Sequence, residues 1–206
     1  MCSIVNTALL ILMPTRVYIL ARAFSQHKGA TRHWNSTGKP DNMHGTGLTL
    51  REYSAHLSVW SVLASPLIHS ADLRTVQARH PDCLALMINP EIIAVNQDAA
   101  VMPPKLLFAL TNVSGKAYSE VNSTAIVAQA WARPLSHGRH AVVLFNRGEV
   151  EATLSFTWAQ LALPAGASVS IRDVVNRKTL GNFLGPTWSI PVAPHAAAFV
   201  VLSPYK

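Results

Sequence analysis

The residues of this chain best suited to chemistry are its carboxylates, because two acids facing one pocket can serve as nucleophile and proton donor in glycoside hydrolysis. Asp72 and Asp98 each follow a short apolar run, where α/β enzymes place functional side chains. A loop or cap role explains both equally well, and Glu52 and Asp82 fit helix-capping or turn positions. The full set of acids is Asp41, Glu52, Asp72, Asp82, Glu91, Asp98, Glu120, Glu149, Glu151 and Asp173.

Other kinds of site find little support in the residue types and spacings. No Gly-x-Ser-x-Gly stretch indicates a nucleophilic serine, and no Cys-x-x-Cys or paired-histidine spacing indicates a metal. Gly45-Thr46-Gly47 is too short for a phosphate-binding loop. We therefore expect no metal and no cofactor. Tryptophans could stack on sugar rings, but Trp60 and Trp158 lie in patterns that predict core positions.

Composition excludes disorder and argues against nucleic-acid binding. Of 206 residues, 50% are hydrophobic and 13% charged, which is enough apolar surface to support a core. The net charge is +7, but the basic residues are scattered, and their longest run is Arg177-Lys178. A nucleic-acid partner needs a clustered basic patch, so we rank that function last.

Residues 1–33 stay unassigned. Pro14 and Arg16 interrupt their apolar run, and no basic residue precedes it, which disfavours both a membrane span and a secretory signal. A strand or short helix from a larger core, or a wrongly chosen start of the reading frame, is at least as good an explanation. Cys2 could pair with Cys83, although its terminal position argues against this. Three Asn-x-Ser/Thr tripeptides, at Asn35, Asn112 and Asn122, would be glycosylated only in a secretory lumen.

Residues 34–100 predict alternating helices and strands, which is an α/β pattern. Thr49 and Glu52 fit a capping box at the start of a helix that Pro66 ends. We expect a buried strand at Pro66–Ser70, a helix from about 75 to 87, and a strand at Ile92–Val95. The expected apolar face of the first helix consists of Leu50, Tyr53, Leu57, Trp60 and Ala64.

Residues 101–206 change to a two-residue period after the junction at Ala99–Pro104. Short alternating runs separated by Gly, Pro and Asn predict an antiparallel β-sandwich, a domain of ordinary size. The predicted strands lie at 141–145, 152–158, 167–174, 188–190 and 198–202.

Several blocks of residues resemble the C-terminal half of α-galactosidases of the melibiase type, glycoside hydrolase family 27. They follow the family's order near its spacing, over roughly Trp34 to Pro204. The blocks are Trp34-Asn35, Pro40–Met43, Leu48–Tyr53, His56–Trp60, Ala64–Ile68, Asp72–Arg74, Ile92–Asp98, Trp131–Ser136 and Ala141–Arg147.

This resemblance implies the last one or two units of a (β/α)₈ barrel in residues 34–100, followed by a C-terminal β-sandwich in 101–206. The implied chemistry is retaining hydrolysis of terminal α-galactosyl groups by two aspartates. In the family both precede the Trp-Asn…Pro-Asp block, and residues 1–33 contain no Asp. Lys39-Pro40-Asp41 imitates part of the nucleophile motif, but proline would break its strand. We therefore assign no catalytic residue and expect no activity from this chain alone.

Asp41 is the one substrate-binding residue that the resemblance carries over, because it matches the aspartate of the Pro-Asp-Met block. Its implied role is to accept hydrogen bonds from galactose hydroxyls or to support a catalytic neighbour. The chain departs from the family at Ser36–Lys39, at Asn42 and at Ala99–Val101, all in pocket-side segments. The alternative function is a non-catalytic sandwich that binds carbohydrate or protein. The implied partner is an α-galactoside or galactose, a homodimer is left open, and a secreted, lysosomal or vacuolar location rests on resemblance alone.

Overall fold

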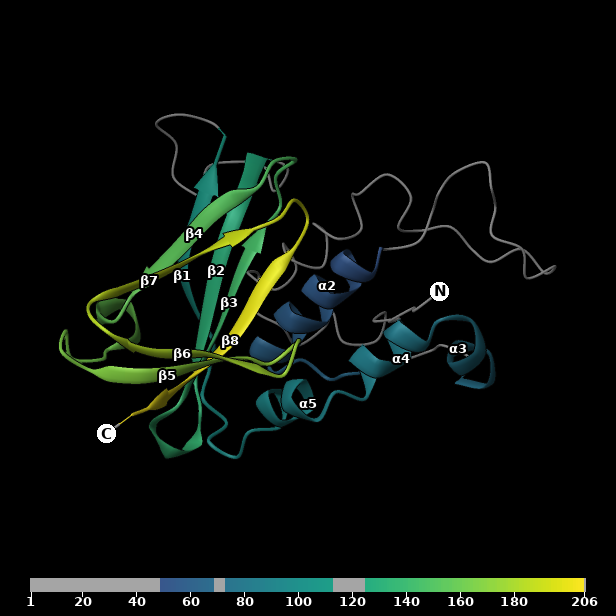
Figure 1. Cartoon of the computed structure of the whole chain (residues 1–206), viewed down its shortest axis with the longest axis horizontal. Coiled ribbons are helices and arrows are strands. Elements are labelled where there is room, and N and C mark those ends of the chain that lie inside the picture. Colours follow the sequence, from purple (N-terminus) through teal and green to yellow (C-terminus); the bar gives the residue numbers. More distant parts are fainter. Residues whose placement is uncertain (1–48, 69–72, 113–124, 206) are drawn as a thin grey trace.

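The computed structural model describes residues 49–68, 73–112 and 125–205. Over these ranges the chain forms four α-helices followed by eight strands, and the helices lie beside one face of the strands (Figure 1). Within the same ranges, each helix is too short or too polar to cross a bilayer.

Helix α2 (Leu50–Val62) begins where its capping box predicts. The Thr49 hydroxyl accepts a hydrogen bond from the Glu52 backbone at 3.2 Å, and Glu52 Oε2 accepts one from the Thr49 backbone at 2.8 Å. The predicted apolar face is only partly right: Tyr53 and Leu57 are buried, whereas Leu50 is 45% exposed. The helix also buries a second face, because it packs against a sheet as well as against other helices.

The stretch predicted as one helix from 75 to 87 forms two, α3 (Leu73–Arg79) and α4 (Pro81–Met87). Pro81 cannot continue a helix but fits the first turn of a new one. The strand predicted at Ile92–Val95 is wrong, because these residues lie in helix α5 (Pro90–Asn96). Asn89 caps that helix and Pro90 starts it, so the local start signal outweighs the apolar run.

The strand predicted at Pro66–Ser70 is also not found in the part that the structure describes. Residues 66–68 have no regular structure, and Ile68 is 51% exposed; residues 69 and 70 lie outside the described ranges. A parallel strand needs hydrogen-bonding neighbours, and none of the strands in the described ranges pairs with this run.

The strands form two antiparallel sheets, which confirms the predicted sandwich. The larger sheet has the order β1-β2-β3-β8-β5-β6, and β4 pairs with β7 in the smaller one (Figure 1). Their bounds are β1 (Lys105–Thr111), β2 (Ile126–Pro134), β3 (His140–Asn146), β4 (Ala152–Thr157), β5 (Ser168–Asp173), β6 (Lys178–Leu184), β7 (Thr187–Val192) and β8 (Ala197–Pro204).

The six-stranded sheet carries a hydrophobic core on each face, as β2 illustrates. Ala128, Ala130 and Ala132 face the two-stranded sheet and pack in the sandwich core with Phe156 and Trp158. Trp131, between them, points to the opposite face, because successive strand residues alternate. There it shares a second core with residues of α2, α5, β3 and β8, among them Ala55, Val59, Val62, Ile92, Val95, Val143, Phe199 and Val201.

The chain changes from helices to strands between Asn96 and Lys105. The two domains predicted at 34–100 and 101–206 nevertheless share the second core, so the boundary at residue 100 stays a prediction. Trp158 is fully buried, as predicted, whereas Trp60 is only half-buried.

Candidate functional site

The residue predicted to contact sugar, Asp41, lies outside the described residues, and so does Asp72. The disulfide proposed between Cys2 and Cys83 falls outside them too, because Cys2 does. Glycosylation also stays a prediction: Asn112 is exposed at the end of β1, but the other tripeptide residues lie outside the described ranges. In residues 49–68, 73–112 and 125–205, no group of three His, Cys, Asp or Glu side chains is arranged to hold a metal.

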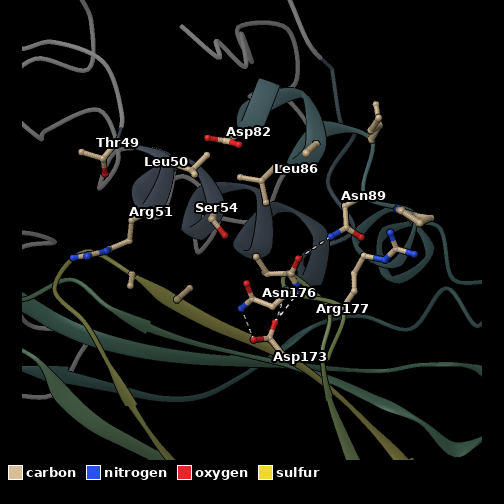
Figure 2. A pocket seen from close by; sticks show the side chains of 16 residues that line it. Thr49, Leu50, Arg51, Ser54, Asp82, Leu86, Asn89, Asp173, Asn176 and Arg177 are labelled. Atoms are coloured by element: carbon tan, nitrogen blue, oxygen red, sulfur yellow. Dashed lines mark hydrogen bonds between the residues drawn. The ribbon is translucent and has the colours of Figure 1, made fainter. Parts of the chain in front are cut away.

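A groove of about 1090 Å³ lies between the helices and the turn that joins β5 to β6. Figure 2 shows its two sides: α2 and α4 on one, and the turn residues Asp173, Asn176 and Arg177 on the other. Its lining mixes apolar and polar side chains, namely Thr49, Leu50, Arg51, Ser54, Asp82, Ala85, Leu86, Ile88, Asn89, Pro90, Asp173, Val175, Asn176, Arg177, Ala196 and Ala197.

Asp173 does not present a free carboxylate to this groove. Its Oδ1 accepts hydrogen bonds from the backbones of Val175 at 2.9 Å and Asn176 at 3.0 Å, and its Oδ2 accepts one from Asn176 Nδ2 at 2.7 Å. An aspartate that satisfies the backbone of its own turn is a structural residue. The groove therefore offers other hydrogen-bonding groups to a ligand, but the Asp173 carboxylate is already hydrogen-bonded within its turn.

Asn89 joins α5 to the β5–β6 turn at the end of the groove. Its Oδ1 accepts hydrogen bonds from the backbones of Glu91 at 2.9 Å and Ile92 at 3.4 Å, which caps the helix. Its Nδ2 donates to the carbonyls of Val174 at 2.9 Å and Val175 at 3.1 Å. One side chain, only 4% exposed, thus uses both ends of its amide to hold the helix on the sandwich.

Glu91 makes a second contact across the seam between the helices and the sandwich. Arg172 donates to both its carboxylate oxygens, from Nε at 2.7 Å and from Nη2 at 2.6 Å, and Arg177 Nε lies 3.5 Å away. The hydrogen bonds from Arg172 lower the pKa of Glu91; burial opposes this, and the charges of both arginines add to the lowering. This two-pronged contact ties the first turn of α5 to β5.

Asp98 lies beyond the other end of α5, and its carboxylate is also engaged. Oδ1 accepts hydrogen bonds from the backbones of Ala100 at 3.0 Å and Ser136 at 2.8 Å. Oδ2 accepts from Ser136 Oγ at 2.8 Å and from Arg139 Nη2 at 3.0 Å. Burial alone would raise the pKa of Asp98, but these hydrogen bonds and the Arg139 charge outweigh it and hold the pKa below its ordinary value.

The structure thus places one of the two strand-end candidates, Asp98, in a network that suits the cap role rather than catalysis. Sequence reasoning missed the residues that make the seam between helices and sandwich: Asn89, Glu91, Arg133 and Arg172. Asn89-Pro90-Glu91 is a helix-start signature that could have been found in the sequence. Arg133 and Arg172 carry no such local signal, because their partners lie far along the chain.

Two family models match the chain. The model described as "Alpha galactosidase A" matches residues 23–98, and the model described as "Alpha galactosidase C-terminal beta sandwich domain" matches residues 127–202. The first match covers the described helices, and the second covers β2 to most of β8.

Known proteins agree with these matches. An α-galactosidase from Cyamopsis tetragonoloba is 32% identical over 171 residues, which is 83% of this chain and 37% of that protein. The crystal structure of α-galactosidase I from Mortierella vinacea superposes with a TM-score of 0.62 at 27% identity, covering 78% of this chain and 38% of that one. An α-galactosidase from Saccharomyces cerevisiae, solved with raffinose, shares the fold with a TM-score of 0.62 at 22% identity, covering 78% of this chain and 45% of its own. The chain spans somewhat over a third of the length of the curated relatives.

Proposed function

Because the chain belongs to the α-galactosidase (melibiase) family of glycoside hydrolase family 27, as a barrel portion joined to the C-terminal β-sandwich, we propose that it serves the hydrolysis of terminal α-galactosyl groups. Its share of that task is structural: residues 34–100 supply the last barrel units, and residues 101–206 supply the sandwich on which they rest. The observation that carries this proposal is the ordered pair of family matches, at residues 23–98 and 127–202.

We further propose that these 206 residues by themselves do not hydrolyse galactosides. Retaining hydrolysis requires two carboxyl groups about 5 Å apart on opposite sides of the scissile bond. The family's two aspartates precede the Pro-Asp block, and no Asp stands in residues 1–33. In the described ranges, the side chains of Asp98 and Asp173 are engaged in hydrogen bonds within the fold. Asp41 remains the proposed contact to the sugar.

Incubation of the purified chain with an aryl α-galactoside tests the absence of catalysis. We expect release of the aryl alcohol at the uncatalysed rate, with the Cyamopsis tetragonoloba enzyme as the active control. Turnover well above that rate, abolished by Asp41→Asn, would mean that this chain assembles a catalytic site of its own.

A second candidate function is binding of galactose without hydrolysis, and the groove is the observation that favours it. Its lining includes Ser54, Asn176 and Arg177, whose side chains can exchange hydrogen bonds with hydroxyl groups. None of the tryptophans that the structure describes lines the groove, so calorimetry is a better probe than fluorescence. Galactose at millimolar concentration should release heat with the wild type and less with Asn176→Ala. A flat titration of the wild type removes this candidate.

A further inference from the structure

The short helix α5 is held on the sandwich at both of its ends. At its N-terminal end, Asn89 and Glu91 contact the β5–β6 region, as described above. At its C-terminal end, Arg133 of β2 donates to the carbonyls of Val95 and Asn96. The two ends thus contact different parts of the six-stranded sheet, because β3 and β8 lie between β2 and β5.

Arg133 is a buried cation placed at a helix C-terminus. Arg133 is 2% exposed. Its guanidinium donates to carbonyls at the end of the helix, where intrahelical donors run out. Burial lowers the pKa of Arg133, while the charge of nearby Asp98 raises it. A buried charge is costly unless its partners are fixed, so the position of α5 relative to β2 is tightly specified.

Asp98 completes the same contact from the helical side. It follows α5 directly, is 4% exposed in its side chain, and binds Ser136 and Arg139 of the β2–β3 connection. Ser136 Oγ in turn accepts from Arg139 Nη2 at 3.1 Å, so the three side chains form a closed set. We call Asp98, Arg133, Ser136 and Arg139 the latch.

The latch reaches α2 through one further hydrogen bond. Asn96 Nδ2, at the last residue of α5, donates to the carbonyl of Ser65 at 2.8 Å, just beyond the end of α2. Val95 of α5 and Val62 of α2 also lie in the shared core. The latch is therefore linked to the end of α2, which also contacts the sheet directly at β2, β3 and β8.

We propose that Asp98 is a positioning residue, which acts through the latch to fix α5 and α2 on the sandwich without being required for the sandwich itself to fold. This deepens the proposed function, on which its role in catalysis rests: the stretch carrying Asp41 leads directly into α2. The geometry of the latch, unlike that role, is independent of any activity.

Hydrogen exchange of the full 206-residue chain, read segment by segment, tests the latch without substrate. In Asp98→Asn, amides of residues 90–96 and of the last turn of α2 should exchange about tenfold faster or more, since the carboxylate charge and the acceptor for Ser136 Oγ and Arg139 are lost. Amides of β4 and β7, in the sandwich core, should keep the wild-type rate. Ser136→Ala should give the same pattern with a smaller change.

Gln160→Ala is the control, because Gln160 Oε1 also accepts a backbone hydrogen bond, from Thr157, but in the connection after β4 and away from the β5–β6 turn that holds α5. It should leave residues 90–96 at the wild-type rate. If amide exchange in Asp98→Asn became faster in β4 and β7 by as much as in α5, Asp98 would be needed for the whole fold, and the proposal would be overturned. Unchanged exchange of α5 in Asp98→Asn would also overturn it; should that variant not fold, Ser136→Ala and Arg139→Gln decide by the same criterion. Failure of the galactoside proposal would leave these exchange rates unaffected, so the two outcomes are distinguishable.

Discussion

At the scale of single residues, Asn89 uses both ends of its side-chain amide to join the helices to the sandwich. Its amide accepts from two backbone groups of α5 and donates to two carbonyls of the β5–β6 turn. Each of these bonds joins segments that are far apart in the sequence or satisfies a helix end, so no other side chain of similar size replaces it.

Asn89→Ala should lower the free energy of unfolding by about 2 kcal/mol, since it removes a helix cap and leaves buried carbonyls without donors. Urea denaturation followed by circular dichroism measures this. Asn176→Ala is the control, because Asn176 is exposed and bonds only within its turn, and it should cost less than about 1 kcal/mol. Equal losses in the two variants would contradict the assignment of Asn89 to the seam.

Glu91 predicts a pH dependence of stability. Its pKa in the folded chain lies below its ordinary value of 4.5, so its ion pair stabilises the fold above that pH and is lost as the pH falls through the lower folded value. Wild-type stability should therefore fall as the pH drops below 4.5. Unfolding midpoints from pH 7 downward should fall less steeply in Glu91→Gln. Parallel slopes for the two proteins would show that Glu91 contributes nothing to this dependence.

At the scale of elements, α2 shows how a helix can bury polar residues. Ser54, Ser58 and Ser61 recur at three- and four-residue spacing and so lie along one side of the helix axis, and Ser65 follows just beyond the end of the helix. The last three are fully buried. Ser58 Oγ donates to the carbonyl of Ser54 at 2.7 Å, whereas Ser61 Oγ is buried and finds no hydrogen-bond partner within residues 49–68, 73–112 and 125–205. Small side chains permit close approach of a neighbouring helix, and α2 packs chiefly against α5 among the helices.

Ser61→Ala should therefore leave stability unchanged or raise it by up to about 1 kcal/mol, because it removes a buried hydroxyl that lacks a partner. Ser61→Leu should lower stability, because the larger side chain would force α2 away from its neighbour. Thermal denaturation of both variants checks the two signs. A loss of more than about 1 kcal/mol in Ser61→Ala would indicate that the hydroxyl has a structural role.

At the scale of the whole molecule, helices and sandwich share the core built around Trp131, Val143 and Phe199. A shared core makes the unfolding of one part expose apolar surface of the other, which favours a single cooperative transition. The sandwich has in addition its own core between the two sheets. The helices have a smaller cluster of their own, in which Tyr53, Val76 and Met87 are buried, so they should not remain folded when the sandwich unfolds.

Urea unfolding of the wild type should accordingly give coincident transitions by circular dichroism at the helical band and by tryptophan fluorescence. In Asp98→Asn the helical transition should move to lower urea than the main fluorescence transition, since the latch is weakened while Trp158 and Trp188 stay in the sandwich core. The signals of Trp60 in α2 and Trp131 in the shared core should change with the helices. Separate transitions already in the wild type would show that the shared core does not couple the two parts.

The sequence by itself determined the elements whose signals are local. A capping box placed the start of α2, and an apolar run at 141–145 that ends at Asn146 placed β3. Alternation over 167–174 placed β5, because a strand with one buried face repeats every two residues. Alternation failed for β2, which is buried on both faces, and its polar Gln129 and Arg133 conceal it further. The family blocks likewise indicate a barrel portion and a sandwich.

Only the tertiary structure decided how these parts meet. Residues 66–68 lie irregular because a parallel strand exists only through its neighbours, and Ile92–Val95 form a helix that the sandwich holds at both ends. Asp98 and Arg133 bind partners about 40 residues away in the chain, and Arg172 binds Glu91 about 80 residues away. A hydrogen bond over such a separation leaves no trace in local spacing, since it arises from packing of the finished fold.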